Sequence, residues 1–258
     1  MLTSWLETAV RTDTTLPFQV LDVRELPVER SLLVQTLAKE LLVAHKDPAH
    51  LQRVAARAGL PRVRQYLASE VFPTRRNVRI GDFGEVLGAA ILRERDGLYL
   101  PIFKLRYREK RDWPMRLTDL LALQRDHAHG FTAIRFGEVK TRTAADVQAA
   151  CKGHESLASE LATERPEIIA FVINRLFDQG RLEEADALEE LLASGGSGIP
   201  RHHDVFLLFE RAAWNEEGLR RLAALPLRLP NLRVQVILID RLSPLVDECY
   251  RHVTEILQ

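Results

Sequence analysis

Four side chains in this sequence have the types and spacing that metal-assisted phosphodiester hydrolysis needs. The tetrapeptide Phe-Gly-Glu-Val occurs twice, and each copy places a glutamate, Glu85 or Glu138, among apolar residues. Lys140 follows Glu138 by two positions, so in a strand the carboxylate and the amine would share one face. Asp119 is another single acid in an apolar run, RLTDLLAL. An apolar setting makes each carboxylate costly to bury unless it is paired, protonated or bound to a metal.

A hairpin that pairs residues 116–126 with 131–140 would bring Asp119 close to Glu138. Two converging carboxylates repel each other unless a hard divalent cation lies between them, and Mg²⁺ (or Mn²⁺) suits oxygen ligands. Such an ion polarises a phosphodiester and lowers the pKa of a bound water, while a lysine orients the nucleophile or stabilises developing charge. We therefore expect Asp119 and Glu138 to hold the metal and Lys140 to act beside it.

Glu85 also has a simpler explanation. In the run FGEVLGAAIL it is the only charged residue, and small residues share its helical face. If the helix begins near Asp82, Glu85 lies close to the helix N-terminus, where the positive end of the helix dipole favours a carboxylate. Lys140 is one of only six lysines beside thirty arginines, and an amine, unlike a guanidinium, loses its proton readily when buried.

The elements that must position these residues follow from apolar spacing and from Gly and Pro breaks. Helices are predicted over 29–44, 47–60, 62–72, 81–95, 144–164, 166–177, 181–194 and 243–258. Strands are predicted over 17–23, 97–110, 116–126, 131–142, 204–210 and 232–240.

Strands mixed with flanking helices predict an α/β fold with a central mixed sheet. We expect residues 1–70 to be a mainly helical segment packed on an α/β domain formed by residues 71–258.

A basic segment precedes Asp119. Residues 75–116 contain eleven Lys/Arg and six Asp/Glu, whereas residues 155–190 contain three arginines and ten acids. If 97–110 is a strand, alternate cations form one row, which suits a phosphate backbone. The alternative is a solvated edge strand that its charges protect from aggregation. The expected DNA contacts are Lys104, Arg106, Arg108 and Lys110.

Composition is that of an ordinary globular protein, with 46% hydrophobic and 28% charged residues and a formal net charge of zero. No apolar run approaches the length of a membrane span, and the first residues lack a basic region followed by an apolar core. The two cysteines have no metal-ligand spacing. We therefore expect a cytoplasmic protein with no membrane contact.

The order of a helical glutamate, Asp119 and Glu138-x-Lys140 is similar to the core of PD-(D/E)xK nucleases. The usual proline is not adjacent to Asp119, because Pro114 lies five residues earlier. More closely, GDFGEVLGAAIL, KLRYREKRDWPMRLTDLLAL and FGEVKTR resemble the DUF1837 family, which includes HamA of the Hachiman anti-phage system. The resemblance covers roughly residues 75–165.

This resemblance implies a restriction-endonuclease-like core and a metal-dependent DNA endonuclease effector with little sequence specificity. It also implies a HamB-like helicase partner that restrains the nuclease. By this resemblance, Glu85, Asp119, Glu138 and Lys140 occupy the positions of the active site, and Glu85 joins Asp119 and Glu138 as a metal ligand. Gln148 matches a glutamine found in some members of the wider superfamily, although it is equally well explained as a polar helix position.

Two other functions compete with the nuclease. The first is a non-catalytic nucleic-acid-binding scaffold that keeps a nuclease-like fold, and it predicts DNA binding without products. The second is a regulator that reads DNA with residues 47–70 as a helix-turn-helix, although simple packing explains two helices joined at a Gly-Pro break.

Overall fold

The computed structural model describes residues 2–12, 15–126, 130–162, 166–193 and 199–255. Across these residues the chain forms one six-stranded mixed sheet in the order β1-β2-β6-β5-β4-β3. The strands β2, β6, β5 and β4 are parallel neighbours, and β1 and β3 add antiparallel edges. The predicted α/β class, with a mixed sheet flanked by helices, is confirmed, and this architecture is consistent with a nuclease-like core.

The strands are β1 Leu6–Val10, β2 Gln19–Glu25, β3 Leu120–Asp126, β4 Gly130–Arg142, β5 Arg201–Glu210 and β6 Leu232–Ile239. The α-helices are α1 Leu2–Trp5, α2 Arg30–His45, α3 Pro48–Ala58, α4 Leu60–Tyr66, α5 Arg76–Glu94, α6 Ala149–Glu160, α7 Glu167–Asp178, α8 Leu182–Ala193, α9 Glu217–Ala223 and α10 Leu242–Glu255. A π-helical turn covers Leu67–Val71, and 3₁₀ turns cover Lys104–Tyr107 and Arg211–Ala213.

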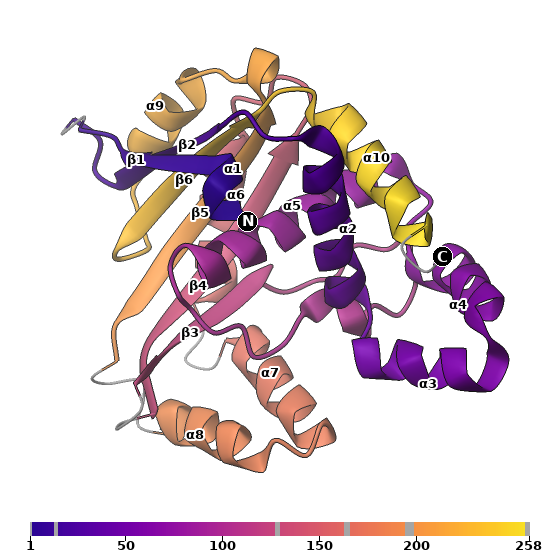
Figure 1. Ribbon diagram of the computed structural model, residues 1–258. Helices are drawn as coiled ribbons and strands as arrows, with labels where there is room; N and C mark the ends of the chain where they lie inside the picture. Colours follow the sequence, from indigo (N-terminus) through magenta and orange to yellow (C-terminus); the bar gives the residue numbers. More distant parts are fainter. Residues whose placement is uncertain (1, 13–14, 127–129, 163–165, 194–198, 256–258) are drawn as a thin grey trace.

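Each face of the sheet has its own apolar core. Helices α2, α5 and α10 pack on one face, where their side chains meet Val139 and Phe206. Helices α6 to α9 pack on the other face, against Phe136 and Val205. Figure 1 shows α2, α5 and α10 gathered together, α7 and α8 lying side by side near β3, and α3 and α4 extending away from the sheet. Side chains that alternate along β4 therefore enter different layers.

Helix α5 is longer than predicted, and this changes the setting of Glu85. The helix begins at Arg76 because the Asp112 side chain, distant in sequence, accepts hydrogen bonds from the backbone N–H groups of Thr74 (2.7 Å) and Arg75 (2.8 Å). A carboxylate there satisfies donors that a helix start leaves free. Glu85 therefore lies in the middle of α5, and the explanation by the N-terminal helix dipole is wrong.

The predicted strand over 97–110 is also wrong. Tyr99 exchanges backbone hydrogen bonds with Leu123 as an isolated bridge (2.8 and 2.9 Å), but the ladder does not continue. Pro101 has no N–H to donate, and the segment then turns through the 3₁₀ helix at Lys104–Tyr107. The basic side chains of this segment consequently do not form one row.

The predicted division at residue 70 stays a prediction, although the sheet takes β1 and β2 from before it. The helix predicted over 144–164 begins only at Ala149, which leaves Gln148 at its N-cap position. Helices α3 and α4 meet at Gly59, where φ is +78°. Among the described residues, none of the helices is long and apolar enough to cross a membrane.

We expect Gly84→Ala to destabilise the protein by about 1–3 kcal/mol, because it overpacks the contact between α5 and β4. A Cβ at Gly84 would overlap the Thr141 hydroxyl and lie 3.1 Å from Val139 Cγ1. The matched control is Gly81→Ala on the same helix, where a Cβ meets nothing within 4 Å. Alanine should stabilise that position by about 0.5–1 kcal/mol. Urea denaturation measures both changes, and equal effects of the two variants would contradict this packing.

Candidate active site

The candidate site lies where β3 begins and β4 continues without a partner on that edge. Leu120 pairs with Gly137, so β3 covers β4 only up to this point, whereas β4 runs on to Arg142. Asp119 directly precedes β3, and its Oδ2 accepts a hydrogen bond from the backbone N–H of Val139 at 2.9 Å. The Asp119 side chain therefore accepts the β4 hydrogen bond that a neighbouring strand would otherwise accept. This bond holds the Asp119 carboxylate at the open edge of β4.

Glu138 and Lys140 reach this edge from the α6 side of the sheet. Their side chains share a face of β4, and Lys140 Nζ donates a 2.6 Å hydrogen bond to Glu138 Oε1. On α6, Gly153 allows close packing against Val205, because a Cβ there would lie 2.7 Å from Val205 Cγ1, and Lys140 Cγ would lie in ordinary contact at 3.5 Å. Glu138 is only 5% exposed. Burial, and then the charge of Asp119, raise the pKa of Glu138 above its usual value.

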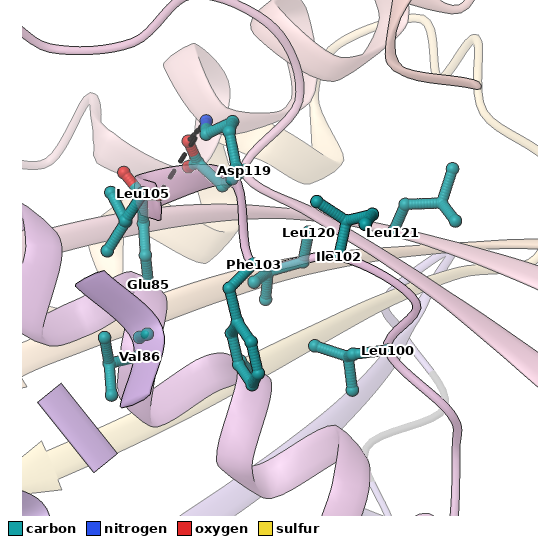
Figure 2. Close-up of a pocket in the computed structure, with 12 residues that line it drawn as sticks. Glu85, Val86, Leu100, Ile102, Phe103, Leu105, Asp119, Leu120 and Leu121 are labelled. Atoms are coloured by element: carbon teal, nitrogen blue, oxygen red, sulfur yellow. Dashed lines mark hydrogen bonds and ion pairs between the residues drawn. The ribbon is translucent and has the colours of Figure 1, made fainter. Parts of the chain in front are cut away.

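Glu85 approaches from the opposite layer, on α5. Figure 2 shows Glu85 and Asp119 at the polar end of a pocket whose other labelled residues are apolar. Between them lies the Lys104 ammonium, 3.0 Å from Asp119 Oδ1 and 3.7 Å from Glu85 Oε2. The same ammonium donates to the Leu117 carbonyl at 3.2 Å. The site thus draws residues from both faces of the sheet to the start of β3.

Lys104 also belongs to this site, although its sequence position predicted a contact with DNA. It is 5% exposed, and burial alone would lower the pKa of its ammonium. The attraction of Glu85 and Asp119 outweighs that effect and raises the pKa. The only available signal in the sequence was the rarity of lysine, because nothing local connects Lys104 with residues on α5 and β3.

The residues fit a hard divalent cation in donor type and charge. Three carboxylates, on Glu85, Asp119 and Glu138, face two amines, on Lys104 and Lys140. The raised pKa values of Glu85 and Glu138 show that these amines do not fully stabilise the charged carboxylates. Asp119 and Glu138 are oxygen donors of the kind that Mg²⁺ takes together with several waters.

The expected convergence of all three carboxylates on one ion is not found. Among the described residues, no three His, Cys, Asp or Glu side chains are grouped so that they could hold a metal. Lys104 is the reason, because its ammonium occupies the position between Glu85 and Asp119. A metal at this site would therefore take Asp119 and Glu138 first.

A buried ionic cluster fixes α5 beneath Glu85. Asp82 accepts from both guanidinium nitrogens of Arg108, at 2.6 Å for Nη1, and lies 2.9 Å from His45 Nε2. His45 Nδ1 also contacts the Leu41 carbonyl at 2.8 Å. The cluster ties α2 and the segment after the 3₁₀ turn to one turn of α5, so it positions Glu85 without touching the carboxylates around Lys104.

The four cations predicted to contact DNA have different environments. Lys104 and Arg108 are in the ion pairs described above, and the Nε of Arg106 donates to the Val43 carbonyl at 2.9 Å. Lys110 lies over the Trp113 ring, 4.0 Å from its centroid. Gln148 is exposed, and its backbone N–H donates to Asp146 at 3.0 Å. The strand that was to align the cations is absent, because the buried carboxylates draw Lys104 and Arg108 inward.

We expect Arg108→Ala to destabilise the fold by about 3–5 kcal/mol, because it leaves the buried Asp82 carboxylate without its main partner. Lys110→Ala removes the same charge from the exposed Trp113 ring and should cost about 1 kcal/mol or less. Denaturant unfolding compares the variants, and adding Asp82→Asn to Arg108→Ala should recover part of the loss. Equal stabilities of the two alanine variants would contradict the structural role of Arg108.

The pKa of Glu85 predicts how stability depends on pH. Burial raises this pKa well above its usual value; Lys104 opposes the rise and Asp119 adds to it. The folded chain therefore keeps the proton of Glu85 to higher pH than the unfolded chain does. The stability that the retained proton contributes is fully present below the usual carboxyl pKa. It is lost as the pH rises through the pKa that Glu85 has in the folded chain.

In EDTA, the Tm of Glu85→Gln should consequently fall less than that of the wild type between about pH 5 and about pH 8. The control is Glu189→Gln, which removes an exposed carboxylate from α8 and should leave the pH dependence unchanged. If plots of Tm against pH for Glu85→Gln and the wild type were parallel, burial would not penalise the charge on Glu85.

Comparison with known proteins places the chain in a family. A family profile described as HamA matches residues 2–230, a range that includes Glu85, Asp119, Glu138 and Lys140. The Hachiman protein HamA of Bacillus cereus is 26% identical to this chain over 121 residues, which are 47% of this chain and 42% of that relative. The chain thus aligns with less than half the length of this curated relative. Because the family match extends over most of the sequence, the chain belongs to the HamA family.

Proposed function

We propose that this protein is the nuclease effector of a Hachiman-type anti-phage defence system and hydrolyses DNA phosphodiester bonds with a divalent metal. The observation that carries the proposal is the meeting of Asp119, Glu138 and Lys140 at the open edge of β4, in a chain of the HamA family. Order along the chain supports it as well, because Glu85, Asp119 and the Glu-x-Lys strand follow one another as in PD-(D/E)xK nucleases.

The residues divide the chemistry among themselves. Asp119 and Glu138 would hold Mg²⁺ or Mn²⁺, which when bound supplies Lewis-acid polarisation of the phosphodiester and a water of lowered pKa. Lys140, held 2.6 Å from Glu138, is placed to orient the attacking water and to stabilise negative charge on the phosphate. Lys104 keeps Glu85 and Asp119 together and reduces their mutual repulsion.

A helicase partner forms part of the proposal. A defence nuclease with little sequence specificity must be restrained in an uninfected cell, and a HamB-like helicase that responds to aberrant DNA would provide that restraint. The acidic helix α8 carries Glu183, Glu184, Asp186, Glu189 and Glu190 and offers a surface for basic residues of such a partner.

Plasmid cleavage tests the nuclease. The purified chain should degrade plasmid in Mg²⁺ and not in EDTA, and its helicase partner should suppress this cleavage until aberrant DNA is added. Glu138→Gln and Lys140→Ala should each lower the rate by about 10²-fold or more, because each removes a group that acts on the metal or the reacting phosphate. Glu70→Gln and Lys39→Ala, which remove the same charges from exposed helical positions outside α8, are the matched controls.

A non-catalytic scaffold is the alternative, and the same experiment separates it. A scaffold would bind DNA with salt-dependent affinity, would yield no metal-dependent product in any mixture, and would bind equally well after Glu138→Gln. A product that EDTA does not prevent, or that Lys140→Ala leaves unchanged, would also count against the proposed site.

A further inference from the structure

A cleft of about 560 Å³ opens beside the carboxylates, and the reaction proposed above gives it no role. Its walls come from the segment that precedes β3 and from α7. The volume lies within the range of about 300–1,000 Å³ that is usual for ligand sites. The residues that the argument uses are Tyr107, Lys110, Trp113, Arg116, Phe171 and Arg175.

Aromatic rings and cations predominate among the polar and aromatic residues of this cleft, with Glu109 as its one lining acid among the described residues. Trp113 is 54% exposed, and Lys110 Nζ lies 4.0 Å from its ring centroid. The Arg175 guanidinium lies 4.9 Å from the Tyr107 ring and 5.4 Å from the Phe171 ring. The exposed Trp113 ring beside cations offers an aromatic face for stacking next to positive charge.

The cleft connects directly with the carboxylates through Leu117. This residue lines the cleft, and its carbonyl accepts from Lys104 Nζ at 3.2 Å, while Lys104 also contacts Asp119. Leu117 has φ +78°, a left-handed conformation that bulky residues adopt at a cost of about 1–3 kcal/mol. The Leu117 backbone, held in this strained conformation, thus lies between the cleft and the Lys104–Asp119 pair.

We propose that this cleft binds single-stranded DNA, with unpaired bases stacked on Trp113 and phosphates on Lys110, Arg116 and Arg175. The inference rests on the proposed function for the choice of DNA. Base faces are available for stacking only in an unpaired strand, whereas a duplex covers them with neighbouring bases. Cations alone would serve duplex DNA or an acidic peptide equally well, and the aromatic faces favour the single strand.

Binding without cleavage tests this proposal. In EDTA, the full-length Glu138→Gln chain should bind a short oligothymidylate more tightly than a duplex of the same length, with quenching of tryptophan fluorescence. Trp113→Ala should weaken binding by about tenfold or more and abolish the quenching, whereas Trp113→Phe should retain most of the affinity. Arg116→Ala should reduce the slope of log affinity against log salt by about 0.7.

Matched controls isolate the cleft. Trp214→Phe removes a half-buried tryptophan and should leave the quenching intact, and Arg57→Ala removes an exposed cation on α3 and should leave the salt slope intact. Thermal unfolding should show that Trp113→Ala, a change at an exposed side chain, keeps the fold.

Three results would overturn the inference: unchanged oligothymidylate binding by Trp113→Ala, equal affinity and quenching with duplex, or equal quenching by poly-L-glutamate. Because binding is measured in EDTA on an inactivated site, it is independent of catalysis. Cleavage without oligothymidylate binding would refute only the cleft, and binding without cleavage by the wild-type chain would refute only the nuclease.

Discussion

The rest of this structure depends on one electrostatic constraint: three carboxylates are largely removed from water, and only two amines compensate their charge. Glu85, Asp119 and Glu138 lie where β3 begins, with Glu138 buried and the other two half-buried, and with the amines of Lys104 and Lys140 among them. Glu85 comes from α5, Lys104 from the 3₁₀ turn, and Glu138 and Lys140 from β4, while Asp119 directly precedes β3. All of these elements must therefore be in place before the charges can be compensated. A cluster of this kind costs stability, and such a cost is usual where a fold supports chemistry.

The two Phe-Gly-Glu-Val segments solve the same packing problem in different secondary structures. In both, the phenylalanine and the valine enter the core, and the glycine permits close approach of another element. Gly84 lets α5 approach Thr141, and Gly137 lets β4 approach Leu120 and Phe206. This close approach brings both glutamates to the edge where β3 begins. The repetition is therefore a coincidence of sequence with a shared physical cause, and not an internal repeat of the fold.

Sequence patterns were most informative where the residues are apolar. The strands around Ile134, Val205 and Val234 were predicted because buried strands are marked by runs of apolar side chains, and β4 placed Glu138 and Lys140 on one face as expected. The pairing of β3 with β4 also followed, and with it the approach of Asp119 to Glu138. Patterns failed between Arg75 and Tyr107, where Asp112 extends α5 from a distance and Pro101 ends the ladder with β3.

By itself, the sequence determined the α/β class and the order along the chain of the candidate residues Glu85, Asp119, Glu138 and Lys140. Local spacing is sufficient for these features, because side-chain periodicity follows from backbone geometry alone. Only the tertiary structure decided that Lys104 lies between Glu85 and Asp119 and that Arg108 compensates Asp82. A charged row and a buried ion pair look the same in sequence, since the partner of a buried charge is chosen by proximity in space and by the cost of leaving it unpaired in a low dielectric.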